Sequence, residues 1–460
     1  MIHPQTLHAD RSPMINTPAA PGSPIAIRSA CLDFVADPFY VPESQAVRYF
    51  PDALLVIDRG HIQALGDYQQ LQPTYADLPL ITYPEHLIIP GMIDLHLHLP
   101  QTEMIASYGE QLLEWLETYT FPTEQKFRDK AYAHQVAEVF VAELLRNGTT
   151  TAVVLAAVYP ESVEALFEVA EQRNLRLIAG KVMMDRHAPT ALMDTAQSSY
   201  TESKALIETW HNRGRLLYAI TPRFAPTSTP AQLEAARQLL QEYPDTYLHT
   251  HLSENIDEVN WVRSLFPQAK NYLDVYDQAG LVGDRSIFAH GIQLTDEEFQ
   301  RLSEAKSAIA FCPTSNLFLG SGLFKLEQAK SQAFPIHVGL ATDVGAGTSF
   351  SLLQTASEAY KVAQLRRQKL SPFQALYLAT LGGARSLSLE DKIGSLEPGK
   401  EADFVVLDWR STPLLAFRNP ARIPQQLSEL ADRLFSLIIV GDDRAVAATY
   451  IMGVLAHLRD

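Results

Sequence analysis

Two histidine pairs, each with one residue between its members, are the first feature that could do chemistry. They are His96 with His98, and His249 with His251. On a β-strand, residues i and i+2 point to the same face, so each pair directs two imidazoles toward one point. Neutral imidazole binds Zn²⁺ and related divalent ions. Such pairs also occur by chance or as packed core residues, so neither pair alone predicts a metal site.

Three further polar residues follow apolar runs and extend this pattern. Glu254 lies three residues beyond His251, in an expected loop, where a carboxylate can reach a substrate proton without binding metal. His290 and Asp343 each close an apolar run. Taken singly, each is more often a hydrogen-bonded residue at a strand end. Three histidines and a carboxylate with an open position for water are the composition of a hydrolytic zinc site, so together these residues predict a hydrolytic metal centre.

The elements that must position these residues are strand-like apolar runs that alternate with helical stretches such as 130–145 and 160–171. This alternation indicates repeated βα units and a parallel sheet. Eight units over roughly 250 residues match a (β/α)8 TIM-like barrel, whose active site forms at the carboxyl ends of the strands. An open, doubly wound sheet is the alternative, because counting strands does not decide closure. The expected strands are 93–98, 150–155, 175–183, 216–221, 247–252, 286–290, 308–312 and 337–342.

Both ends of the chain carry shorter β-type runs. Residues 53–57 and 62–65 flank a turn at Asp58, Arg59 and Gly60, which predicts a hairpin. Further β-like runs lie at 393–408 and 445–458. We therefore expect a small β-sandwich built from both chain ends beside the barrel. The predicted division is a flexible extension at 1–24, a first β-sandwich segment at 25–89, the barrel at 90–385 and a second β-sandwich segment at 386–460.

The composition excludes several classes of protein. The formal charge of -16 argues against a protein that coats nucleic acid, which usually carries a basic face. No uncharged apolar run reaches about 18 residues, so no membrane span is expected. Cys31 and Cys312 are the only cysteines, too few for a disulfide framework or for a zinc site of the Pro-Cys-x-x-Cys type. The beginning of the chain lacks the features of a signal peptide, and a cytoplasmic location is predicted.

The order of these residues resembles the amidohydrolase superfamily: a His-x-His after the first barrel strand, histidines after the fifth and sixth, and an aspartate after the eighth. Longer strings resemble its guanine deaminase family, at 100–109, 112–116, 119–122, 221–227, 250–255 and 311–317. The resemblance implies hydrolytic deamination of guanine to xanthine and ammonia by a zinc-activated hydroxide. It also implies one zinc ion per subunit and a homodimer.

The same resemblance assigns roles to single residues. It implies a zinc ion held by His96, His98, His251 and Asp343. Asp343 would also accept a proton from the attacking water, His290 would orient the hydroxide, and Glu254 would deliver protons to the ring and to the departing ammonia.

The expected substrate contacts rest on the resemblance as well. Gln101 and Arg223 would hold the polar edge of the purine, because an amide and a guanidinium can both bond its carbonyl and ring nitrogens. Phe224 would pack against the pocket. Trp115 would cover the ring, although it fits a core position equally well.

Two residues near these positions keep more than one interpretation. His249 is either a partner of a metal ligand or a packing residue. Lys181 falls on the third predicted strand, whereas binuclear relatives carry a bridging lysine after the fourth. This placement favours a single metal ion and a structural role for Lys181.

Two other functions fit the sequence less well. One is a related deaminase that acts on another aminopurine, a pterin or a triazine. The other is a non-catalytic scaffold on the same fold, since fold does not dictate function. A scaffold would be expected to lose metal ligands, and this chain retains them all.

Overall fold

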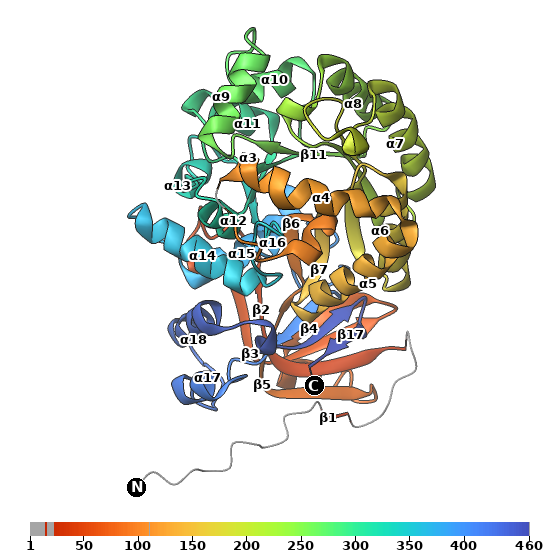
Figure 1. The fold of residues 1–460 in the computed structure, drawn as a ribbon. Helices are drawn as coiled ribbons and strands as arrows, with labels where there is room; N and C mark the ends of the chain where they lie inside the picture. Colours follow the sequence, from red (N-terminus) through yellow and green to blue (C-terminus); the bar gives the residue numbers. More distant parts are fainter. Residues whose placement is uncertain (1–13, 16–22, 110, 460) are drawn as a thin grey trace.

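A barrel of parallel strands forms the upper part of the protein in Figure 1. The computed structural model describes residues 14–15, 23–109 and 111–459. The strands lie side by side in the order in which they occur along the chain. They are β6 (Met92–His98), β7 (Thr149–Leu155), β8 (Arg176–Gly180), β10 (Leu216–Pro222), β11 (Tyr247–Leu252), β12 (Ser286–His290), β13 (Ala308–Phe311) and β14 (His337–Leu340). A short strand, β9 (Val182–Met183), pairs with β10.

The first and last barrel strands meet through the segment that follows β14. Asp343 N donates to the His96 carbonyl at 2.9 Å, and His98 N donates to the Val344 carbonyl at 2.9 Å. These bonds join the two edges, and the strand order has none of the reversal of a doubly wound sheet. The predicted (β/α)8 barrel is therefore confirmed, and the open-sheet alternative is wrong.

Helices cover the outside of the barrel, and their ends follow local sequence signals. Asp129 accepts from the first backbone amides of α5, and Thr295 with Glu298 forms a capping box at α11. Strand β7 is buried along its whole length and rich in β-branched residues, as expected for a strand covered on both faces. The main covering helices are α5 (Lys130–Arg146), α6 (Pro160–Gln172), α7 (Ala196–Trp210), α8 (Pro230–Glu242), α9 (Ile256–Leu265), α10 (Tyr272–Gln278), α11 (Asp296–Ala305), α12 (Pro313–Phe318), α13 (Leu326–Ala329), α14 (Leu352–Leu365), α15 (Pro372–Leu378) and α16 (Leu381–Ser386).

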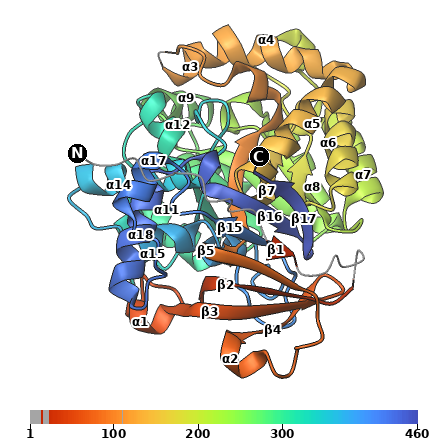
Figure 2. The same cartoon turned by 90° about the horizontal axis from the view of Figure 1, so that it is seen from below.

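A second sheet, below the barrel in Figure 1, joins the two ends of the chain. Seen from below in Figure 2, the blue carboxyl-terminal strands lie beside the orange strand β5. The strands follow one hydrogen-bonded path and share a core that includes Ile27, Leu55 and Phe404. In that path they are β17 (Val454–Leu458), β16 (Val446–Ile451), β15 (Phe404–Leu407), β5 (Leu80–Pro90), β2 (Ile25–Phe34), β3 (Val47–Asp58) and β4 (His61–Asp67), with β1 (Met14–Ile15) paired to β5.

The sequence predicted most of these elements, with local differences. The hairpin at 53–65 is present as β3 and β4, longer than expected. The expected strand 175–183 is interrupted at Lys181, whose backbone amide and carbonyl are bonded by the side-chain hydroxyls of Tyr218 and Thr221 on the neighbouring strand β10, in place of its backbone groups. The expected strand 393–408 is a strand only at β15, because the preceding residues turn at Gly394 and Gly399, whose φ angles are 86° and 91°.

Three further points concern the predicted division of the chain into an extension, a barrel and two sheet segments. Residues 1–13 and 16–22 of the predicted extension lie outside the described residues, and the domain boundaries stay predictions. The carboxyl-terminal segment also holds two helices that β-patterning did not predict, α17 (Pro413–Arg418) and α18 (Leu427–Val440). Among the described residues, none of the helices has the length and apolar character needed to cross a membrane.

Candidate active site

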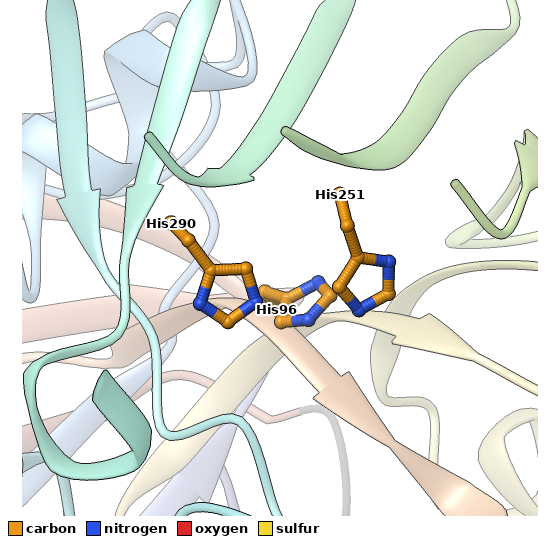
Figure 3. A group of neighbouring side chains, drawn as sticks. All are labelled: His96, His251 and His290. Carbon is orange, nitrogen blue, oxygen red and sulfur yellow. The ribbon is translucent and has the colours of Figure 1, made fainter. Parts of the chain in front are cut away.

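Three imidazoles from separate barrel strands converge at the carboxyl ends of the strands (Figure 3). His96 comes from β6, His251 from β11 and His290 from β12. The His96 ring centroid lies 4.7 Å from that of His251 and 5.4 Å from that of His290. This is the convergence predicted from strands that all end at one rim.

Asp343 and His98 complete this cluster. Asp343 Oδ1 lies 3.2 Å from His96 Nε2 and 3.3 Å from His98 Nε2. His98 Nε2 is in turn 3.3 Å from His251 Nε2, and Asp343 Oδ2 is 3.9 Å from His290 Nε2. The cluster therefore brings the Nε2 atoms of three histidines around one carboxylate, with His251 Nε2 beside that of His98.

Each of three imidazoles has its Nδ1 atom occupied on the side away from the cluster. His251 Nδ1 lies 2.7 Å from the Arg223 carbonyl, which can only accept, so His251 presents an Nε2 lone pair to the cluster. His96 Nδ1 faces His249 Nε2 at 2.7 Å, and His290 Nδ1 faces the Asn316 amide oxygen at 2.9 Å. Such outer partners set the orientation of metal-binding histidines.

The electrostatics of the cluster suit a divalent ion. Burial lowers the pKa of His96 to about 3 and lowers the pKa of His98 and His251 as well, so these imidazoles are neutral, as ligands must be. Burial by itself would raise the pKa of Asp343, but the neighbouring histidines hold it well below its usual value, so this group is a carboxylate. Among the described residues, the buried Nε2 atoms of His96 and His290 have no hydrogen-bond partner. The donor set therefore fits a metal ion.

Two residues of the cluster hold strained backbone conformations. His290 has a φ of 74° and Asp343 a φ of 51°, in the left-handed region that side chains with a Cβ rarely adopt. Strain of this kind persists where the surrounding structure over-determines it, and it is concentrated at functional sites.

Glu254 lies beside the cluster in the loop after β11, as the sequence predicted. Its Oε2 atom is 3.5 Å from His290 Nε2, and its Oε1 atom accepts from Ser321 Oγ at 3.4 Å. Burial, and then the charge of Asp343, raises the pKa of Glu254 to about 8. A carboxyl group with such a pKa can hold and release a proton near neutrality.

A cavity opens above the cluster, and it encloses about 400 Å³ of free space when its open mouth is counted. All four residues predicted to contact substrate line it. The lining residues are His98, Gln101, Leu112, Trp115, Leu116, Arg223, Phe224, His251, Glu254, His290, Leu319, Asp343 and Ala346.

The walls of the cavity come from two segments. Trp115 belongs to α3 (Leu112–Trp115), which continues through the π-helical stretch Leu116–Thr120 into α4 (Phe121–Glu124) and covers the cavity. Phe224 follows β10, and its ring centroid lies 6.5 Å from that of His251. Trp115 is 2 % exposed and lines the cavity, so it occupies a core position that borders the pocket.

Three residues of the site were missed in the sequence. Glu124 forms a buried ion pair with Arg223, and Asn316 contacts His290. Glu258 Oε2 accepts hydrogen bonds from the backbone amides of Glu254 and Asn255, at 2.8 and 3.1 Å. The available signal for Glu258 was its spacing from Asn255, which predicts a capping box. Glu124 and Asn316 had no such signal, because their partners lie far away along the chain.

Lys181 lies outside the cluster. Its ammonium group is fully buried and pairs with Asp194 at 2.5 Å and Glu202 at 3.2 Å. These contacts agree with the structural role that its position on the third strand suggested.

Comparison with known proteins places the chain in a family. The model of the amidohydrolase family matches residues 87–456. The chain belongs to the amidohydrolase family. This amidohydrolase is 53% identical to the guanine deaminase of Escherichia coli K12 over 418 residues, which cover 91% of this chain and 94% of that protein.

Solved structures agree with the sequence comparison. The structure of E. coli guanine deaminase superimposes with a TM-score of 0.91 at 51% identity and covers 95% of this amidohydrolase and 100% of that chain. A guanine deaminase from C. acetobutylicum, with guanine bound in its active site, has a TM-score of 0.85 at 28% identity over 94% of this chain and 100% of that one. The resemblance to guanine deaminases predicted from the strings around Gln101 and Arg223 is confirmed.

Proposed function

We propose that this enzyme deaminates guanine hydrolytically to xanthine and ammonia, with one zinc ion per subunit. The observation that carries the proposal is the convergence of neutral imidazoles and the Asp343 carboxylate at the floor of a cavity that Glu254 also lines. The guanine deaminases that this chain resembles, one of them with guanine bound, support the choice of substrate.

The ligands proposed for the zinc ion are His96, His98, His251 and Asp343, as neutral nitrogen donors and one carboxylate. A zinc ion bound there would supply Lewis acidity that lowers the pKa of water from 15.7 to about 7. Asp343 accepts a proton of the attacking water, and His290, held by Asn316, orients it toward the carbon that bears the exocyclic amine.

Glu254 carries protons in this proposal. Its carboxyl group is buried beside His290 and holds a proton near neutrality. It first protonates the ring nitrogen next to the carbon under attack. Asp343 gives back the proton that it took from the water, and the hydroxyl group left on the carbon loses the second one. Through Glu254, one of these two protons goes to the leaving amine and the other restores the protonated Glu254, so that one water is consumed and one ammonia is released per guanine.

The cavity wall supplies the contacts proposed for the purine. Gln101 and Arg223 are buried polar residues that line it and can bond the carbonyl and ring nitrogens of guanine. Phe224 and Trp115 offer apolar surfaces to a planar ring. Hydrogen-bond matching of this kind can separate related substrates by about 10⁴–10⁵-fold.

The direct test is ammonia release from guanine by purified, zinc-loaded protein. Adenine, cytosine and 8-oxoguanine are measured side by side. We expect guanine to be turned over fastest, and elemental analysis to find one zinc per chain. If guanine releases no ammonia while another purine, a pterin or a triazine is turned over, the substrate assignment is wrong.

His249 provides a test of the metal proposal. Replacing His249 with Leu removes the acceptor of the His96 Nδ1 hydrogen and is expected to weaken zinc binding about 10–100-fold. Competition with a chelator measures this affinity. His134→Gln, on the outer surface of α5, is the matched control and should bind zinc as the wild type does. Unchanged affinity in the His249 variant would assign His249 to packing alone.

A homodimer is also proposed from the resemblance, and a cytoplasmic location from the two free cysteines. Light scattering during size-exclusion chromatography tests the first, with a mass of twice 51.2 kDa expected. A mass near that of one chain across the working concentration range would rule out a stable dimer.

A further inference from the structure

The charge of Arg223 is matched by a residue that lies outside the cavity. Arg223 Nη1 donates to both carboxylate oxygens of Glu124, each at 2.8 Å. The two side chains are only 3 % and 1 % exposed. Arg223 lines the cavity, whereas Glu124 does not. Glu124 therefore acts on the cavity only through Arg223.

The pairing leaves some N–H groups of the guanidinium available to a ligand. Glu124 engages only Nη1, and among the described residues no hydrogen bond occupies Arg223 Nη2 or Nε. The planar guanidinium is fixed by this bond and by the Phe121 ring, whose centroid lies 5.7 Å from Arg223 Cζ. The remaining N–H groups can donate to a ligand with a defined direction.

The pairing also decides how much charge the Arg223 wall contributes to the pocket. A buried guanidinium without a counter-charge would be costly and would attract anions strongly, since charges interact over longer distances in a medium of low dielectric constant. With Glu124 in contact, the pair has no net charge. Guanine is neutral near pH 7, so a pocket wall at Arg223 that donates hydrogen bonds without adding a positive charge matches it.

Glu124 further connects two regions of the site. It ends α4, the last stretch of the segment that brings Leu112, Trp115 and Leu116 to the cavity. Arg223 follows β10, and its carbonyl accepts from His251 N at 3.2 Å and His251 Nδ1 at 2.7 Å. The ion pair thus joins the covering segment to the backbone that orients a proposed metal ligand.

We propose that Glu124 is a positioning residue that determines specificity: by neutralising and orienting Arg223, it makes the pocket select neutral purines over anionic ones. The proposal rests on the proposed function, because it takes the purine as the ligand of Arg223.

The test measures the affinity of zinc-loaded Glu124→Gln for guanine and for urate, a purine that is an anion at neutral pH. Glutamine keeps the size of the side chain and removes its charge. We expect the ratio of urate affinity to guanine affinity to rise at least about tenfold over the wild type, as expected for an uncompensated charge in a buried site. Inhibition constants and calorimetry report urate binding, and KM with kcat reports guanine. Glu124→Asp keeps the charge and should return the ratio toward the wild-type value.

A matched control separates selectivity from stability. Asp33→Asn weakens another ion pair, between the buried Asp33 and the partly buried Arg48 in the terminal sheet, and is expected to lower the melting temperature without changing the urate-to-guanine ratio. If Glu124→Gln weakens both ligands equally, or leaves the ratio within twofold of the wild type, the proposal is overturned.

A second pair of variants, both carrying Arg223→Gln, keeps the test decisive if Glu124→Gln alone does not fold. In Arg223→Gln, the unpaired Glu124 carboxylate should disfavour urate, and adding Glu124→Gln to that variant should restore urate binding at least about tenfold. No change on that addition also overturns the proposal. Failure of the wild type to release ammonia from guanine would instead refute the proposed function, so the two outcomes are distinct.

Discussion

Glu254→Gln is expected to lower kcat for guanine by about 10²–10⁴-fold while the enzyme keeps its zinc. Glutamine occupies the same volume and can still accept from Ser321, but it cannot carry a proton. Because Glu254 is not among the proposed ligands, the metal content should remain that of the wild type. Steady-state kinetics, with elemental analysis of the same preparation, measures both quantities.

The control for this variant is another carboxylate that is far from the cavity. Glu327 pairs with Arg366 on the outside of the barrel, and Glu327→Gln should keep the wild-type kcat. The KM of Glu254→Gln should change little, since its shape and its place in the wall are preserved. A kcat within a few-fold of the wild type would show that Glu254 is not the proton carrier.

Removal of the metal is expected to abolish guanine turnover and to lower thermal stability. Without the ion, the Asp343 carboxylate and the buried nitrogen atoms around it lose their shared partner. A ligand present at 1,000 times its Kd stabilises the folded state by about 4.1 kcal/mol, so zinc should raise the melting temperature clearly. Dialysis against a chelator followed by stepwise return of zinc, monitored by ammonia release and calorimetry, measures both effects.

Asp343→Asn is the companion variant for this experiment. It keeps the shape of the side chain and removes the charge, so returned zinc should restore neither activity nor stability to the wild-type level. If chelated wild-type enzyme kept its full rate, or if Asp343→Asn recovered that rate, the metal centre would have to be assigned to other residues.

The sequence predicted the convergence of the histidines and Asp343 well because its signals are local. A strand repeats every two residues, so a His-x-His pair aims both rings at one point regardless of the rest of the fold. A parallel barrel then brings the ends of all its strands to one rim. From these two regularities, the positions of His96, His290 and Asp343 followed before any contact between them was known.

Pairings between distant segments were not predictable in this way. Glu124 and Arg223 are separated by 99 positions, and no spacing rule relates a residue in a covering helix to one after the fourth barrel strand. The contact of His249 with His96 spans 153 positions, so the sequence left packing and partnership equally open for His249. The break of the third strand at Lys181 likewise depends on the hydroxyl groups of other elements.

The sequence by itself determined the βα alternation, the residue types at the strand ends and, through resemblance, the family of the enzyme. The tertiary structure alone decided that the sheet closes, that His96, His251 and His290 each have a partner behind the ring, and that the charge of Arg223 is neutralised. The physical reason is that strand periodicity and capping act over a few residues, whereas closure, burial and ion pairing depend on which distant groups the folded chain brings within a few ångströms.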